Sequence, residues 1–268
     1  MASICSNSGF AQTTPRTTPR SGLPTSLASL LIALSLNLAG HAAPITWGAA
    51  TNITPAAVET DVVTTGSLVA AFNIGTTGVS GTTVNGVAFA PFAIPSDGNV
   101  GSITVGNFTL NFASGRYADN TLFGSSAAPF SLLTAPYRTL LQSAAATTSS
   151  DITLTMGGLT VGQSYLFEWW SNDSGPRFFP YSTTATNVNT VALNDNTSGF
   201  VAGGIGQFAT GTFTADGTSE VITFSGISQT PLINAFQLRT VPEPSTWAMV
   251  GFGIAALLGA RRLSRGKA

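Results

Sequence analysis

The sequence has almost no cysteine or histidine. Among its 268 residues, Cys5 carries the single thiol and His41 the single imidazole. Both lie in the first 42 residues, which have the pattern of a cleaved leader, as described below. A chain without this leader has no Ser/His/Asp triad, no cysteine nucleophile and no Cys/His zinc site. Disulfide bonds are excluded as well, so its stability must come from packing.

Charge is also scarce. Charged residues make up 8% of the chain, against roughly 25% in typical soluble domains. Residues 43–241 hold four basic residues against ten acidic ones, a balance that repels phosphate groups and predicts no binding of nucleic acid. The last eight residues differ, because four of them are Arg or Lys.

The N-terminus has the three-part pattern of a secretory signal. Residues 27–38 form an uncharged apolar run with two arginines and no acidic residue upstream. Small residues precede Ala43, and this layout predicts a signal peptide over residues 1–42. Cleavage is expected after Ala42, because cleavage one residue later would place Pro44 next to the cut bond. A buried core helix is the alternative, and the run is too short to span a bilayer permanently.

The C-terminus, residues 241–268, has a different pattern. A Pro-Glu-Pro triplet is followed by an apolar run over residues 247–260 and then by paired arginines. Fourteen helical residues extend about 21 Å, against a hydrocarbon core of ~30 Å. Long arginine side chains reach the interface and reduce this deficit. On physical grounds the run predicts a short C-terminal transmembrane helix.

This tail resembles the PEP-CTERM sorting signal, which is also described as an ice-binding protein C-terminal motif. The residues that carry the resemblance are Pro242, Glu243, Pro244, Arg261 and Arg262. In that family a membrane transpeptidase, exosortase, is thought to cut near the motif and pass the protein outward. The resemblance therefore implies exosortase as a partner, anchoring in the inner membrane through the helix, and then a place at the cell surface or in the extracellular matrix. It does not imply ice binding.

The region between these ends, residues 43–240, reads as short strands. Apolar and polar residues alternate in residues 108–112 and 152–156, and residues 165–170 place their aromatic side chains on two faces. These patterns are typical of strands in antiparallel sheets. Asn85-Gly86 between two such runs predicts a two-residue hairpin turn. One stretch differs: the paired leucines predict a short helix over residues 137–145, interrupted upstream by Pro136.

Residues 137–239 also resemble the galactose-binding-like jelly roll often found ahead of PEP-CTERM tails. The resemblance rests on a Gly-Leu-Thr-x-Gly-Gln turn at residues 158–163 and an aromatic strand ending in Asn-Asp at residues 165–173. The expected fold class is therefore all-β: an antiparallel jelly-roll β-sandwich with one short helix, flanked by an N-terminal signal helix and a C-terminal transmembrane helix.

Acidic residues are the remaining candidates for acid–base chemistry. Glu168 lies mid-strand among aromatic residues, where burial would raise its pKa. Paired with Asp173 or Asp195 it would give the two carboxylates of a glycosidase. Acidic residues scattered over a sandwich are usually solvated, so we expect no catalytic residues and no enzyme.

Two clusters offer oxygen ligands for a metal ion. They are Asn172-Asp173 and Asn194-Asp195-Asn196, and calcium prefers such oxygen donors. Their spacing matches no EF-hand, and Asn and Asp commonly form loops. We expect no cofactor, with a structural calcium ion as the alternative.

Carbohydrate binding requires aromatic faces beside amide and carboxylate groups. The candidates for such a surface are Trp169, Trp170, Asn172, Asp173, Arg177 and Tyr181. Neighbouring residues on a strand point to opposite faces, so one tryptophan belongs to the core. The other is expected to be exposed or to lie under the loop at residues 172–181.

Together these patterns predict an exported cell-surface or extracellular-matrix protein with a structural or interaction role. The first alternative is a carbohydrate-binding module for exopolysaccharide, and a secreted glycoside hydrolase is less favoured. The sequence identifies no ligand.

Overall fold

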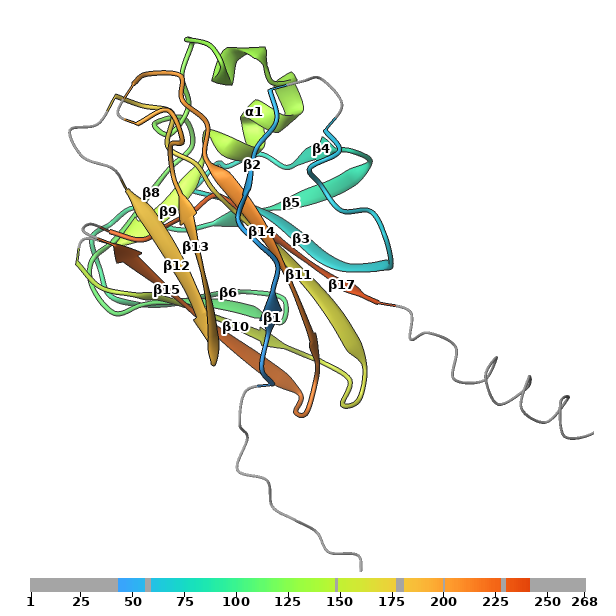
Figure 1. Ribbon diagram of the computed structural model, residues 1–268. Coiled ribbons are helices and arrows are strands. Elements are labelled where there is room, and N and C mark those ends of the chain that lie inside the picture. Colours follow the sequence, from blue (N-terminus) through green and yellow to red (C-terminus); the bar gives the residue numbers. More distant parts are fainter. Residues whose placement is uncertain are drawn as a thin grey trace, which may run out of the picture. The chain divides into compact units, whose positions relative to one another are not determined.

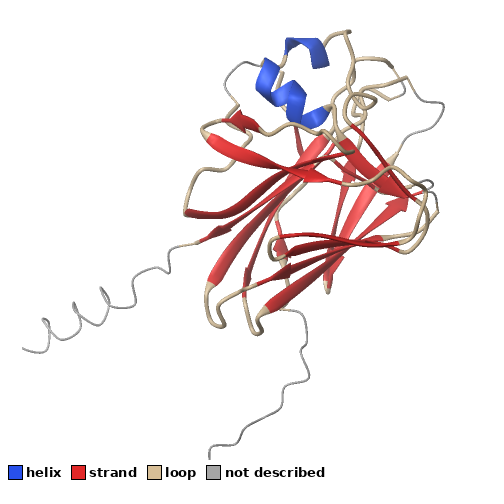
Figure 2. Cartoon of the chain, turned by 180° about the vertical axis from the view of Figure 1, so that it is seen from behind, coloured by secondary structure: helices blue, strands red, loops and turns tan. Residues whose placement is uncertain are grey.

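Two large β-sheets face each other across the main core (Figures 1 and 2). The computed structural model describes residues 43–55, 59–147, 149–176, 181–199, 201–227 and 230–241. The expected signal helix, the Pro-Glu-Pro triplet and the C-terminal helix lie outside these residues. Within the described ranges, no helix has the length and apolar character needed to cross a membrane.

The elements of the described residues fall into three sheets and two short helices. The eight-stranded sheet contains β1 (Thr46–Trp47), β2 (Thr51–Asn52), β3 (Ser67–Gly75), β4 (Thr82–Val84), β5 (Val87–Ala93), β11 (Ser164–Ser171), β14 (Gln207–Thr214) and β17 (Ala235–Thr240). The six-stranded sheet contains β6 (Gly101–Val105), β7 (Phe108–Phe112), β10 (Ile152–Gly157), β12 (Ser182–Asn187), β13 (Asn189–Asn194) and β15 (Ser219–Ile227). A small third sheet contains β8 (Arg116–Asp119), β9 (Ala144–Thr147) and β16 (Leu232–Ile233). The helices are the 3-10 turn η1 (Phe130–Leu132) and α1 (Ala135–Leu141).

The strand order confirms the predicted β-sandwich. The large sheets run β1-β14-β11-β17-β3-β5-β4 and β13-β12-β15-β10-β7-β6. From β10 onward the chain passes from one sheet to the other at β11, β12, β14, β15 and β17, and this alternation is typical of jelly rolls. The strand pairs are antiparallel except β3 and β5, which run parallel.

The main core lies between the two large sheets. The ring of Phe72 on β3 lies with its centroid 5.3 Å from each of Phe92, Phe108 and Phe236. Phe108 comes from the opposite sheet, so this aromatic group joins the two layers. Trp169 on β11 makes a second link, with its ring 4.9 Å from that of Phe224 on β15. Such aromatic pairs stabilise the interface beyond the area that they bury.

The outer face of β11 is buried as well, in a second core. The expected division of this strand into two faces is correct, and Trp170 lies on the face opposite Trp169. The expectation that Trp170 is exposed or covered by residues 172–181 is wrong, because it is 0% exposed. Its ring packs against Phe89 at 5.7 Å, and its indole N–H donates to the Tyr137 hydroxyl at 3.2 Å. The β4–β5 hairpin and α1 thus cover this face.

Two local predictions have different outcomes. The Asn85-Gly86 turn between β4 and β5 is confirmed, with φ of 47° and 75° at its two residues. The helix begins at Ala135 and ends at Leu141, so the predicted range of residues 137–145 is wrong at both ends. Pro136 is accommodated in the first turn, where no backbone donor is needed. Ala144 instead begins β9, whose pairing with β8 outweighs the helical preference of alanine.

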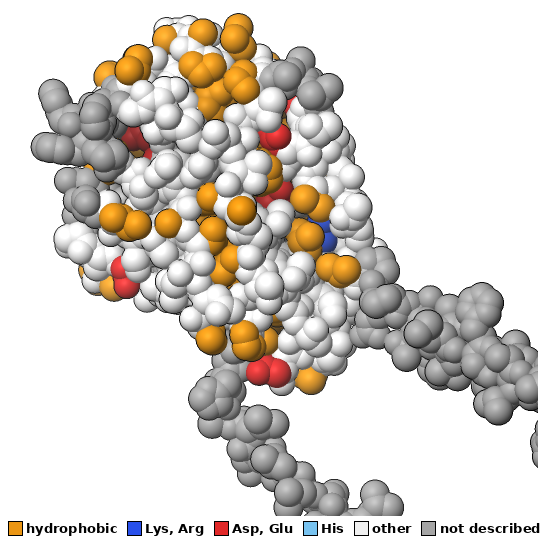
Figure 3. Space-filling model, viewed as in Figure 1, with side chains coloured by type: hydrophobic (Ala, Val, Ile, Leu, Met, Phe, Trp, Pro, Cys, Tyr) orange, Lys and Arg blue, Asp and Glu red, His pale blue; other side chains and the backbone are white. Residues whose placement is uncertain are grey.

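The surface of the sandwich reflects the composition. In the view of Figure 3 most of the described surface is backbone or neutral polar side chains, apolar groups are scattered over it with several gathered at the top, and charges are few. Among the described residues, the ion pair between Arg116 and Asp97, at 2.7 Å, is the single salt bridge.

Replacing Trp170 with Ala is expected to lower the free energy of unfolding by about 3–5 kcal/mol, because it leaves a cavity in the second core. Trp170→Phe keeps most of the apolar contact and should cost clearly less. Urea unfolding of both variants measures the difference. A loss below about 1 kcal/mol for Trp170→Ala would contradict the burial described above.

Candidate functional site

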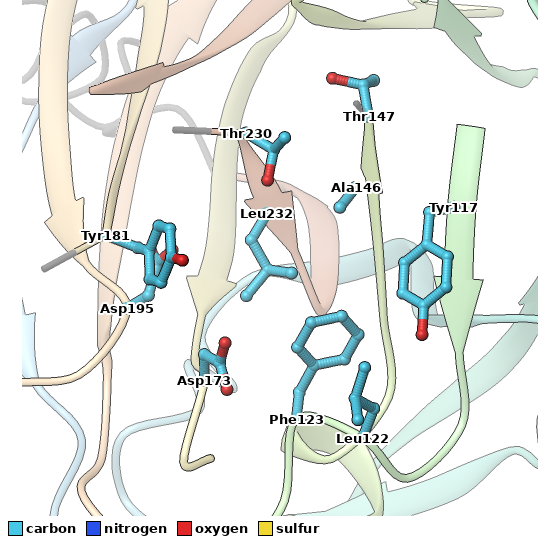
Figure 4. A pocket seen from close by; sticks show the side chains of 10 residues that line it. All are labelled: Tyr117, Leu122, Phe123, Ala146, Thr147, Asp173, Tyr181, Asp195, Thr230 and Leu232. Carbon is cyan, nitrogen blue, oxygen red and sulfur yellow. The ribbon is translucent and has the colours of Figure 1, made fainter. Parts of the chain in front are cut away.

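A cavity of about 440 Å³ opens between the third sheet and the loops that follow β11 and β13. Figure 4 shows the side chains around it. They are Tyr117, Leu122, Phe123, Ala146, Thr147, Asp173, Tyr181, Asp195, Thr230 and Leu232. The cavity thus combines aromatic, aliphatic and acidic groups.

The floor of the cavity is apolar. Phe123, Ala146 and Leu232 are buried and form a small cluster of their own. Strand pairing places Ala146 beside both Leu232 and Tyr117, so the three-stranded sheet fixes their positions. The Tyr117 ring meets that of Phe123 edge-on at 6.4 Å. Tyr117 and Leu122 are 37% and 45% exposed, which places them at the rim.

One wall carries two carboxyl groups. The Asp173 amide donates to the Asp195 carbonyl at 2.7 Å, which joins the loop after β11 to the loop after β13. The Asp195 amide in turn donates to the Tyr181 carbonyl at 3.0 Å. In Figure 4, Tyr181 and Asp195 lie on one side of the cavity and Tyr117 on the other.

The Asp195 carboxyl has an unusual environment. Its Oδ1 accepts a hydrogen bond from the Ser171 hydroxyl at 2.7 Å, and the side chain is almost completely buried. Burial raises the pKa of Asp195 to about 7, the Ser171 hydrogen bond opposes this rise, and the nearby charge of Asp173 adds to it. A carboxyl with such a pKa exchanges a proton near neutral pH.

Two buried asparagines hold the loops around the cavity. The Asn172 side-chain amide donates to the carbonyls of Phe123 and Leu141, both at 3.1 Å. The Asn172 backbone N–H donates to the side-chain oxygen of Asn234 at 2.6 Å. Asn234 in turn donates to the carbonyls of Leu141, at 2.8 Å, and Ser143, at 2.9 Å. These bonds tie four separate segments together, and buried polar groups that are fully paired fix one arrangement.

The structure divides the residues predicted to bind carbohydrate. Asp173 and Tyr181 do line the cavity. Trp169, Trp170 and Asn172 are each 0% exposed, so their assignment to a sugar-binding surface is wrong. The tryptophans are used in the two cores and the asparagine in holding the loops. Arg177 lies outside the described residues.

Sequence reasoning missed the other side of the cavity. Tyr117, Leu122 and Phe123 come from β8 and the loop after it, about fifty residues before Asp173 in the chain. A single tyrosine in a run of alternating residues does not indicate that its side chain lines a cavity. The pairing of β8 with β9 brings this segment to the cavity.

Glu168, the predicted acid–base residue, lies elsewhere. It is on the outer face of β11, completely buried, and does not line the cavity that contains Asp173 and Asp195. Its Oε2 accepts hydrogen bonds from the Val63 amide, at 3.1 Å, and from the Gln237 side chain. Burial raises the pKa of Glu168 to about 8, although both donors oppose the rise. The predicted rise in the pKa of Glu168 is confirmed, but the residue lies away from the cavity.

The oxygen-rich loops have internal partners. The side-chain oxygens of Asn172, Asn194 and Asn196 accept hydrogen bonds from Gly206, Ser182 and Ser198, respectively, at 2.9–3.0 Å. In the described ranges, no three His, Cys, Asp or Glu side chains gather as a metal site would require. These asparagines act as loop formers, and structural calcium stays a prediction.

Replacing Glu168 with Gln is expected to flatten the pH dependence of stability. The carboxyl pKa is about 8 in the folded protein, raised from its ordinary value of 4.5. The folded state therefore holds the proton more tightly, and the stability that this contributes is lost as pH rises from about 4.5 through 8. The neutral amide mimics the protonated acid. Glu168→Gln should equal the parent near pH 5 and exceed it at pH 8, by at most a few kcal/mol.

Urea unfolding at pH 5, 6.5 and 8 measures this difference. Asp151→Asn, which removes an exposed carboxylate, is the matched control and should follow the parent. Equal slopes with pH for Glu168→Gln and the parent would refute the assignment.

Three comparisons with known proteins bear on this chain. No curated protein matches it. Among solved structures, a calcium-binding mutant of Bacteroides uniformis beta-glucuronidase 2 is 15% identical over 65% of this chain, with a TM-score of 0.37, and the match spans 18% of that enzyme. A structure of carbohydrate-binding modules from the β-sandwich superfamily is 10% identical over 57% of this chain and 71% of that one, with a TM-score of 0.15. Neither likeness is close enough to bear on function.

The remaining match concerns the end of the chain. Residues 240–263 match the family described as the PEP-CTERM protein-sorting motif. This match includes the Pro-Glu-Pro triplet and the paired arginines recognised in the sequence, and it begins at the last residue of β17. The chain therefore carries a PEP-CTERM sorting motif at residues 240–263, the signal of an exported protein that is sorted by exosortase.

Proposed function

We propose that this protein is a non-enzymatic cell-surface protein that binds a sugar unit of an extracellular polysaccharide in the cavity at the third sheet. The observation that carries the proposal is the composition of this cavity. Exposed tyrosine and leucine side chains stand at its rim, and two carboxyl groups line one wall.

The chemistry of the cavity suits a sugar. Pyranose rings have apolar C–H faces that pack on aromatic rings, which Tyr117 and Tyr181 provide. Their hydroxyl groups donate well to carboxylates, which Asp173 and Asp195 provide. The volume of about 440 Å³ lies within the range of about 300–1,000 Å³ found for small-molecule sites.

The position of the cavity supports a role outside the membrane. It lies at the Ser171 end of β11, where Ser171 contacts Asp195 and the loop carrying Asp173 begins. The last described residue, Val241, donates to the Ser164 carbonyl at 2.9 Å, at the opposite end of this strand. A chain anchored through residues after Val241 would hold the cavity away from the membrane.

A secreted glycoside hydrolase is the second candidate. Glycosidases use one protonated and one ionised carboxyl group. The presence of Asp173 near Asp195, whose pKa is raised to about 7, therefore favours a hydrolase. Two features favour binding instead. Asp195 is 2% exposed and its Oδ1 accepts a hydrogen bond from the Ser171 hydroxyl, and the Asp173 Oδ1 accepts one from the Gly175 amide at 3.0 Å. Both acids thus already stabilise loops.

Removing either tyrosine ring is expected to weaken binding to polysaccharide. Tyr117→Ala and Tyr181→Ala should each reduce affinity about tenfold, since aromatic contacts are worth roughly 1 kcal/mol or more. Affinity electrophoresis through gels containing a panel of polysaccharides measures the loss. Leu132→Ala, an exposed apolar residue outside the cavity, is the matched control and should bind normally.

The same panel separates binding from hydrolysis. Incubation should release no new reducing ends, and Asp195→Asn should not change this result. Release of reducing ends that disappears in Asp195→Asn would establish the hydrolase. Retention unaffected by either tyrosine substitution would end the binding proposal.

Processing of the tail is a separate prediction. Intact-mass analysis of the exported protein should find that the residues following the Pro-Glu-Pro triplet have been removed. Replacing Pro242, Glu243 and Pro244 with alanine should preserve the C-terminal mass and keep the protein in the membrane fraction. Removal of the tail from this variant would contradict recognition of the triplet.

A further inference from the structure

The first described residue of the chain is held by a buried carboxylate. The Ala43 backbone nitrogen donates to Glu220 Oε2 at 2.8 Å, although 177 positions separate the two residues in sequence. Both residues are buried, at 3% and 1% exposure. Ala43 belongs to the main hydrophobic core together with Ile45. The start of the described chain is therefore packed into the sandwich.

Glu220 has no cationic side chain to balance its charge within the described part of the chain. Its Oε1 accepts from the Asn187 side chain and from the Val221 amide, the latter at 2.9 Å. Burial raises the pKa of its carboxyl, these donors oppose the rise, and Asp216 is the nearby charge that adds to it. A buried carboxylate with only neutral donors is costly, and an ammonium group beside it would remove much of that cost.

The sequence predicts such an ammonium group at this position. Signal-peptide cleavage is expected between Ala42 and Ala43, and it would make Ala43 the first residue of the exported chain. We propose that Glu220 is the binding site for the new α-amino group of Ala43, so that removal of the leader completes an ion pair in the sandwich. This inference rests on export and is independent of carbohydrate binding.

The chemical step is an ordinary hydrolysis. Signal peptidase adds water to the Ala42–Ala43 peptide bond, the hydroxyl group completes the Ala42 carboxyl, and a hydrogen completes the Ala43 amine. The amine then takes a proton from solvent, because an α-amino group has a pKa near 8. The single N–H that contacts Glu220 becomes an NH₃⁺ group with three donors, at the same atom and with a full charge.

The following residues hold the new terminus in register. The Ile45 amide donates to the Asn187 side chain at 3.1 Å, and its carbonyl accepts from the Asn189 side chain at 3.0 Å. These asparagines flank Val188, the single residue of the β12–β13 turn, with φ of 54°. A β-branched residue rarely adopts this conformation, and such strain persists where surrounding contacts impose it. The turn is thus shaped around the segment that leads from Ala43.

The test compares the processed protein, purified from exporting cells, with the full-length precursor. N-terminal sequencing should read Ala43 as the first residue. In urea unfolding near pH 7, Glu220→Gln should increase the unfolding equilibrium constant about tenfold more for the processed protein than for the precursor, the equivalent of one pKa unit. Asp151→Asn, which removes an exposed carboxylate that is not among the charges acting on Glu220, is the matched control and should affect both forms equally.

The α-amino group gives a readout that does not require Glu220→Gln to fold. After reductive ¹³C-methylation, NMR should find an amine pKa about one unit above the ordinary value near 8. The stabilisation should be complete below pH 8, while Glu220 stays ionised, and should be lost as pH rises through the raised amine pKa. A first residue other than Ala43, equal effects of Glu220→Gln on both forms, or an amine pKa at or below 8 would each overturn the proposal.

Discussion

The architecture depends on one constraint, the burial of β11 on both faces. Its inner face meets the six-stranded sheet through Trp169, and its outer face is covered by α1 and the β4–β5 hairpin through Trp170. A strand covered twice must be almost entirely apolar, because every polar group on it is cut off from water. Glu168 is the ionisable exception on this strand, and Ser171 is a buried polar residue at its end. Its raised pKa follows directly, since the neutral acid is the form that a dry environment favours.

The same constraint explains where the cavity forms. At Ser171 the strand leaves the two cores, and its next residues must satisfy their polar groups without a sheet partner. Asn172 and Asn234 do so by bonding to carbonyls of α1 and of the Phe123 loop. These hydrogen bonds set the distance between the loop after β11 and the neighbouring segments. The cavity lies beside them. Asp195, held by the Ser171 hydroxyl, closes the wall of that space. A site whose walls are already held by hydrogen bonds loses less entropy when a ligand binds.

Sequence patterns were reliable where burial is one-sided and local. The alternation in β7 and β10 and the Asn85-Gly86 turn identified strands correctly, because period and turn conformation are properties of a few adjacent residues. The end of α1 and the fate of Trp170 were not predictable in this way. Each is decided by a distant segment: β8 pairs with Ala144, and Phe89 covers Trp170. The cavity combines both cases, since Asp173 and Tyr181 lie close in sequence whereas Tyr117 reaches them through strand pairing alone.

The two ends of the sandwich carry different features. One end holds Ala43 and Val241, and the cavity lies at the other. Ala43 and Val241 border the Ser164 end of β11, so both the predicted export signal and the sorting motif join the domain at one end. On the C-terminal side the matched motif begins at Thr240, the last residue of β17. A processing enzyme acting on the tail therefore approaches the end of the folded domain that lacks the cavity. The proposed binding at the opposite end and processing at this one would not compete for surface, so the proposed function allows a ligand to be bound before the tail is processed.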